Sequence, residues 1–165
     1  MTTLLDDAMA HHIWATEQII DVCAGLTEEQ LTTPAPGTYG PIIETLRHLV
    51  STDAWYLTFF LDAPQRLHPD ERPDLAELRR VIGENGRDWA EILAGNPDSE
   101  ANTVEEGEGW RFHAPIGFRL ATTIQHGTDH RSQICTALTS LGIEPPEIDL
   151  WGWGKATGRT RAEYV

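Results

Sequence analysis

Apolar residues recur with the period of an α-helix in four segments of the chain, and this repeat limits the available folds more than any other feature of the sequence. In the first segment the inward stripe consists of side chains three or four residues apart, which are Leu5, Met9, His12, Thr16, Ile19 and Cys23. Such stripes are wide enough to face a shared core. The predicted helices cover residues 3–24, 41–61, 74–94 and 116–141.

Glycine and proline separate these helices. Gly25 ends the first helix, and the prolines and glycines of residues 34–41 indicate a rigid loop. A second connection, 62–73, is rich in proline and charge, and Asp74 is the expected N-cap of the third helix. Together the helices and their mostly short connections predict an all-α fold, a four-helix bundle that occupies residues 1–165 as one domain.

Two segments lack the helical period. The acidic run from Asp98 to Glu108 favours a solvated loop, an irregular insertion before the last helix, and the alternative is a short β-hairpin with strands at 101–104 and 110–113. The tail from Trp151 is rich in glycine, so we expect that it does not hold itself in place but packs on the bundle through its tryptophans. About the last ten residues are expected to be mobile.

Charge and cysteine content exclude several kinds of partner. The chain carries 12 basic and 26 acidic residues, a formal net charge of -14, which disfavours nucleic acids and anionic membranes. The two cysteines, Cys23 and Cys135, lie in apolar helical patterns and are predicted to be buried free thiols. The first residues lack the basic region and apolar run of a signal peptide, so a cytoplasmic localisation is expected.

Three histidines are candidates for a shared site. His126 and His130 are four residues apart on the core-facing side of the last helix, beside Thr123. They are either two ligands of one metal or two core histidines bonded to backbone carbonyls, and Gly127 excludes the His-Glu-x-x-His motif of zinc proteases. On the second helix, His48 shares a semi-polar face with Thr52 and Trp55, so we expect it to look into a pocket.

The remaining histidines have less certain roles. His12 lies on the core stripe of the first helix, where a hydrogen-bonded core histidine is favoured over a fourth ligand or a pocket-lining general base. His11, His68 and His113 neighbour polar or loop residues and are expected on the surface.

Several motifs resemble those of a known family. They are Met9–Trp14, Pro36–Ile42, Thr45–Leu57 and the segment His126–Asp149, which begins His-x-x-x-His-Arg-x-Gln-Ile. The sequence therefore resembles the DinB/YfiT-like superfamily of bacterial metal-binding helical bundles. The resemblance implies an up-down-down-up bundle in which His48, His126 and His130 hold one divalent metal ion, zinc or nickel, and it implies a homodimer.

Known relatives include thiol S-transferases and a thiol-dependent isomerase, so the resemblance implies a metal-dependent enzyme that activates a low-molecular-weight thiol for transfer to a small electrophile. Three histidine ligands with an open fourth position are typical of catalytic metals. The alternatives are a hydrolase that uses a metal-bound water, with His12 as the best candidate base, and a stress-associated metal-binding protein without turnover. Thr52, Asp53, Glu44 and backbone carbonyls are candidates to orient the ligands. The acidic N-terminal region argues against a strongly anionic substrate.

Overall fold

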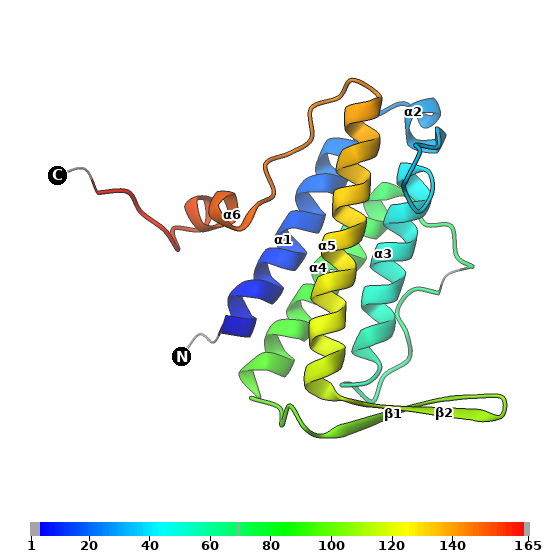
Figure 1. The fold of residues 1–165 in the computed structure, drawn as a ribbon, viewed down its shortest axis with the longest axis vertical. Coiled ribbons are helices and arrows are strands. Elements are labelled where there is room, and N and C mark those ends of the chain that lie inside the picture. The colour runs from blue at the N-terminus through cyan, green and yellow to red at the C-terminus, as the bar shows by residue number, and fades with distance from the viewer. Residues whose placement is uncertain (1–3, 69, 164–165) are drawn as a thin grey trace.

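The computed structural model describes residues 4–68 and 70–163, and six helices and two strands lie within them (Figure 1). In chain order they are α1 (Leu4–Cys23), α2 (Glu28–Thr32), α3 (Ile42–Leu57), α4 (Leu75–Ala94), β1 (Asn102–Gly107), β2 (Trp110–Pro115), α5 (Ile116–Ser140) and α6 (Leu150–Ala156). The four long helices are those predicted, although α3 ends at Leu57 and the turns at 58–60 follow it.

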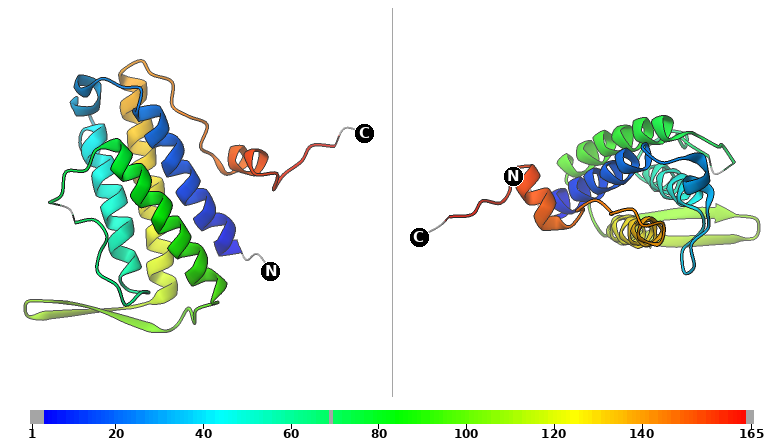
Figure 2. Two further views of the ribbon diagram at one scale, coloured as in Figure 1. Left: turned by 180° about the vertical axis from the view of Figure 1, so that it is seen from behind. Right: turned by 90° about the horizontal axis from the view of Figure 1, so that it is seen from above.

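The long helices form an up-down-down-up bundle, as the resemblance implied. Around the bundle α1 packs against α4, α4 against α3, α3 against α5, and α5 against α1 (Figures 1 and 2). Because α3 and α4 run in the same direction, the connection 58–74 has to return along the length of the bundle. None of the helices in the described part of the chain is long and apolar enough to cross a membrane.

Local capping explains where several helices begin. The side chain of Asp74 accepts a hydrogen bond of 2.8 Å from the backbone N–H of Glu77, which makes it the N-cap of α4 as predicted. Thr27 and Gln30 form the reciprocal capping box of α2.

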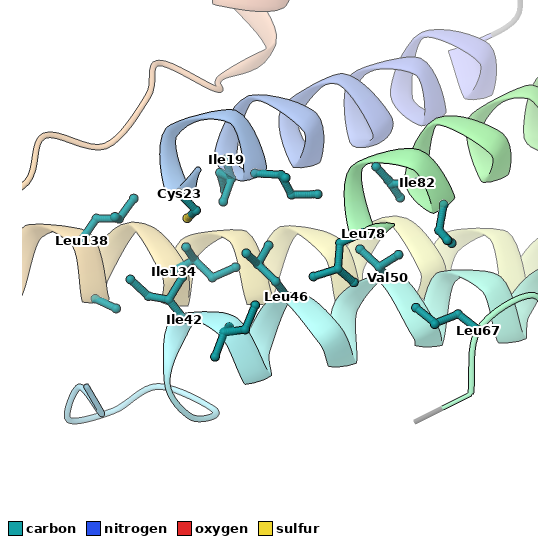
Figure 3. Packing of buried hydrophobic residues seen from close by; sticks show 14 residues of the cluster. Ile19, Cys23, Ile42, Leu46, Val50, Leu67, Leu78, Ile82, Ile134 and Leu138 are labelled. Carbon is teal, nitrogen blue, oxygen red and sulfur yellow. The ribbon is translucent and has the colours of Figure 1, made fainter. Parts of the chain in front are cut away.

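Two apolar clusters fill the bundle. The cluster near α2 includes Ile19, Ile42, Leu46, Leu78, Ile82, Ile134 and Leu138, all of them nearly inaccessible to solvent (Figure 3). The cluster near the hairpin is built from Met9, Tyr56, Leu57, Trp89, Leu93 and Leu120. Along each long helix the members of the two clusters are separated by buried polar residues.

These polar residues are joined around the carboxylate of Asp53. His12 Nε2 lies 2.9 Å from Asp53 Oδ2, and His12 Nδ1 lies 2.8 Å from Arg131 Nη1. Because a guanidinium only donates, Nδ1 accepts and Nε2 carries the proton that is donated to Asp53. Asn85 Nδ2 and Trp89 Nε1 also donate to Asp53, at 2.7 and 3.3 Å. We call His12, Asp53, Asn85 and Arg131 the polar layer; it takes one residue from each long helix.

The segment before α5 forms a hairpin, so the irregular solvated loop favoured from the sequence is wrong there and the alternative is correct. β1 and β2 pair antiparallel, from Asn102↔Pro115 to Gly107↔Trp110, and Figure 1 shows the hairpin lying across the lower end of the bundle and projecting past its side. Gly109, the second of the two turn residues, has φ of 80°, the left-handed conformation that a type II turn places at this position and that glycine adopts without strain. The acidic side chains remain exposed on a paired backbone.

The glycine-rich tail contains a helix that was not among the four predicted, and it packs on the bundle through Trp153, whereas Trp151 is exposed. Asp149 accepts a 2.6 Å hydrogen bond from the backbone of Gly152, which caps α6, and Trp153 is buried against His11. Arg159 pairs with Asp7 at 2.5 Å, so the chain is held well into the segment predicted to be mobile. The end of that segment, residues 164–165, lies outside the described residues.

Gly127 is required by the contact between α1 and α5. A Cβ atom at this position would lie 2.2 Å from Cε1 of His12, whose ring the polar layer holds in place. We expect Gly127→Ala to lower the free energy of unfolding by about 1–3 kcal/mol, the usual cost of overpacking a core. Urea denaturation followed by circular dichroism measures the change.

Gly83→Ala is the matched control, because a Cβ there makes only an ordinary 3.5 Å contact with Glu17. Alanine is favoured over glycine in a helix by up to about 1 kcal/mol, so this variant should be as stable as the parent or more stable. Equal destabilisation by both substitutions would contradict the explanation.

Candidate metal centre

Three histidine side chains meet on the seam between α3 and α5. One nitrogen from each of His48, His126 and His130 lies within 4.8 Å of the others, and this is the group of the described residues able to hold a metal ion. His48 comes from α3, and His126 and His130 come from successive turns of α5. The two α5 rings therefore project toward the same point, where the antiparallel helix brings His48.

Neighbouring side chains orient the rings. His130 Nδ1 lies 3.2 Å from Gln133 Oε1, and His48 Nδ1 lies 3.5 Å from the hydroxyl of Thr52. These contacts leave the Nε2 atoms of His48 and His130 free to face the cluster. His126 Nε2 already lies 3.1 Å from His48 Nε2.

This arrangement fits a metal ion. Nitrogens bound tetrahedrally at the usual zinc–nitrogen distance lie about 3.3 Å apart, close to the separation of His48 and His126. The donor set is three imidazoles without a carboxylate, which suits zinc, copper, iron or nickel better than magnesium or calcium.

Tyr39 forms one wall of the centre and was not predicted from the sequence. Its ring stacks on His48 with centroids 4.3 Å apart and meets the edge of His130 at 5.2 Å. Its backbone N–H donates to Gln133 Oε1 at 2.9 Å, so one amide oxygen connects the 34–41 loop with His130. Pro36–Ile42 was recognised as a family motif, but nothing in the sequence indicated which ligand the loop contacts.

Burial keeps the imidazoles of His48 and His126 neutral. Desolvation, followed by repulsion from His130 and His48, lowers the pKa of His126 to about 4. Burial also lowers the pKa of His48, and His130 adds to that effect. Neutral imidazole is the form that binds metals, so at pH 7 the protein presents these two ligands without having to lose protons.

The other predicted site residues have different surroundings. His12 is fully buried with both ring nitrogens hydrogen-bonded, which matches the favoured core role and leaves no free nitrogen for a ligand or base. Thr52 contacts His48. The ring centroids of Trp55 and Phe59 lie 4.9 Å apart. The buried hydroxyl of Thr123 donates a hydrogen bond to the carbonyl of Arg119.

The carboxylates of Asp53 and Glu44, which were candidates to orient the metal ligands, have other hydrogen-bond partners. Asp53 accepts its hydrogen bonds from the polar layer and Trp89, whereas Glu44 pairs with Arg47 and Arg72 on the surface. The orienting oxygens therefore come from the uncharged side chains of Thr52 and Gln133.

Two surface expectations also change. His11 is not an idle surface group, because its Nε2 lies 2.7 Å from the carbonyl of Ile148 and burial lowers its pKa. A groove of about 1060 Å³ lies between α1 and α4, lined by Ile13, Trp14 and Ala90 among others, and none of its lining residues is one of the three histidines. His68 and His113 are exposed, as expected.

Comparison with known proteins identifies a family for this sequence. The model of the DinB family matches residues 1–160, almost the whole chain. No curated protein matches the sequence.

Removing one ligand should abolish tight metal binding. Loss of a group that merely orients a ligand typically weakens metal affinity about 10–100-fold, so we expect His48→Ala or His126→Ala to weaken zinc binding by about 100-fold or more. Isothermal titration calorimetry on the chelator-treated protein measures this. The control is His68→Ala, since His68 is exposed outside the cluster. Unchanged affinity in the cluster variants would exclude the centre.

The metal-free protein should lose stability as the solution is acidified. The pKa of His126 is about 4 in the folded protein and 6.5 in the unfolded chain. Below pH 6.5 the unfolded chain therefore binds more protons than the folded protein. Between pH 7.5 and 5 this partly exposed histidine should lower the free energy of unfolding by about 1–2 kcal/mol, after allowance for screening by solvent. Urea titrations with chelator at both pH values should show a smaller difference for His126→Gln; an equal difference would refute the assignment.

Proposed function

Because the chain belongs to the DinB family and gathers three histidine nitrogens within 4.8 Å, we propose that it is a metal-dependent enzyme that transfers a low-molecular-weight thiol to a small electrophile. The observation that carries the proposal is the all-imidazole donor set on the seam of α3 and α5. Zinc or nickel is the proposed metal, and both accept imidazole ligands.

A bound divalent ion would supply a Lewis acid that lowers the pKa of a coordinated thiol or water. The protein would contribute orientation and partial shielding from water. Gln133 and Thr52 hold the outer nitrogens of His130 and His48, while the Tyr39 ring shields His48 on one side. The polar layer fixes α3 against α5 and so sets the separation of the ligands.

A thiol is favoured over water as the nucleophile. Hydrolysis usually relies on a general base near the bound water, but His12 and Asp53 are both committed to the polar layer. A thiol ionises far more readily than water and has less need of a base. In the transfer, a carbon–sulfur bond forms, the leaving group departs with the electrons of the broken bond, and the thiol proton passes to solvent.

The protein's own cysteines are poor candidates for that thiol. Burial raises the pKa of the Cys23 thiol to about 12, and it also raises the pKa of Cys135. Thiolate is the reactive form, so both side chains are mainly protonated and weakly nucleophilic at neutral pH. The proposed thiol is therefore a separate small molecule. The homodimer and the cytoplasmic localisation stay predictions.

A screen of thiols against electrophiles tests the proposal. We expect the zinc- or nickel-loaded protein to conjugate at least one of cysteine, glutathione or coenzyme A to monochlorobimane, measured by fluorescence. Chelation and His126→Ala should each reduce the rate by about 100-fold or more, because activation of the thiol depends on the ligand set. His68→Ala should keep the full rate. Metal bound tightly without conjugation of any thiol and electrophile tried would favour a non-catalytic metal-binding protein instead.

A further inference from the structure

Arg119 has a hydrogen-bonding capacity that the folded chain does not use. Its side chain is 4% exposed, and its Nη2 is the one buried side-chain nitrogen or oxygen among the described residues without a hydrogen-bond partner. Its Nε donates to Thr103 at 2.9 Å, and Nη1 lies 3.4 Å from Glu105. A buried charged donor without a partner is destabilising, so such a group calls for an explanation.

The surroundings of Arg119 are aromatic. The centre of its guanidinium lies 3.6 Å from the ring centroid of Phe59, and 5.9 Å from those of Trp55 and Phe112. Stacking on Phe59 stabilises the charge through the ring face. It does not satisfy the N–H groups in the guanidinium plane, which remain suited to a planar anion such as a carboxylate.

Helical spacing connects Arg119 with the histidines. On α5 the positions of Arg119, Thr123, His126 and His130 follow one face at intervals of three or four residues. On α3 the positions of His48, Thr52 and Trp55 continue toward Phe59, just beyond the end of the helix. Because α3 and α5 are antiparallel, the histidines of the two helices meet at one height along the bundle axis. Phe59 and Arg119 meet at another height along the same axis. His126 lies seven positions after Arg119 on α5, which corresponds to an axial rise of about 10 Å.

Aromatic rings in contact with one another line the space between the three histidines and Arg119. The ring of Tyr56 lies 6.4 Å from His126 and 4.8 Å from Trp55, and Trp55 lies 4.9 Å from Phe59. Phe59 is the residue on which the guanidinium stacks. An apolar molecular body lying along this wall would therefore place one end at the histidines and the other at Arg119.

We propose that Arg119 binds a carboxylate of the small molecule whose reactive atom lies at the histidine centre; this rests on the function proposed above. The ligand class is an organic acid with an apolar body and a carboxylate about 10 Å from the atom that reaches the histidines. Glu105 on β1 occupies part of the guanidinium edge in the free protein and is displaced when the carboxylate binds.

The hairpin of β1 and β2 has to move for a carboxylate to reach Arg119. It covers Arg119 through Thr103, Glu105 and Phe112, yet most of its residues are exposed, so little buried area holds it against the bundle. Elements with few buried contacts open at low cost. The acidic surface does not prevent anion binding, because charges beyond about 8–10 Å are largely screened at physiological salt.

The test uses mercaptohexanoate and mercaptohexanol, which share an apolar body and a thiol but differ in the carboxylate. On the zinc-loaded protein we expect calorimetry to show that mercaptohexanoate binds at least about tenfold more tightly than mercaptohexanol. This is the difference expected for one charge-assisted hydrogen bond. Arg119→Gln should remove this preference, and Glu105→Gln should increase it. Arg111→Gln is the matched control, because Arg111 lies on the same hairpin but is exposed and pairs with Glu106.

A second measurement needs no metal. In the metal-free protein, hexanoate should shift the Nε–H nuclear magnetic resonance signal of Arg119, and hexanol should not. If zinc fails to bind, the proposed function fails and this measurement alone decides the role of Arg119. If Arg119→Gln fails to fold, the parent protein and Glu105→Gln decide it. The proposal is overturned if the parent shows no preference for the carboxylate, or if folded Arg119→Gln retains it.

Discussion

The buried carboxylate of Asp53 is the point on which the four long helices converge. It accepts hydrogen bonds from His12 of α1 and from Asn85 and Trp89 of α4, and Arg131 of α5 reaches it through His12. Burial lowers the pKa of Arg131 to about 10, so its charge persists at neutral pH and balances that of the carboxylate. Removing either partner would leave a buried charge uncompensated, which is far more costly than the loss of an apolar contact.

The polar layer also explains why the histidine centre lies where it does. It separates the apolar cluster near α2 from the one near the hairpin, and so fixes the level at which α3 and α5 face each other. Asp53 lies five residues after His48, and Arg131 directly follows His130, so both helices are held next to their ligands. Gly127 serves the same end, because only a hydrogen atom at that position lets the His12 ring lie against α5.

Much of this arrangement follows from local pattern. The apolar periodicity predicts the four long helices, and the i, i+4 spacing of His126 and His130 places both on the inner face of one helix. The hairpin and α6 depend on weaker signals. In the acidic segment Gly109 occupies the turn between the paired strands. At α6 the local features are the Asp149 cap and Trp153, which packs on α1. Arg131 is charged and Asn85 is polar, so hydropathy alone places neither of them in the core.

By itself the sequence determined the helices, the faces they bury and the three histidines that could share a metal, because these depend on spacing along one helix and on motifs that resemble a family. Only the tertiary structure decided which partners the buried polar groups find. Tyr39 meets His48, Gln133 connects His130 with the 34–41 loop, and Arg119 lies under the hairpin. Hydrogen bonds and ring contacts act over a few ångströms, and residues distant in the chain come within that range only after the bundle has closed.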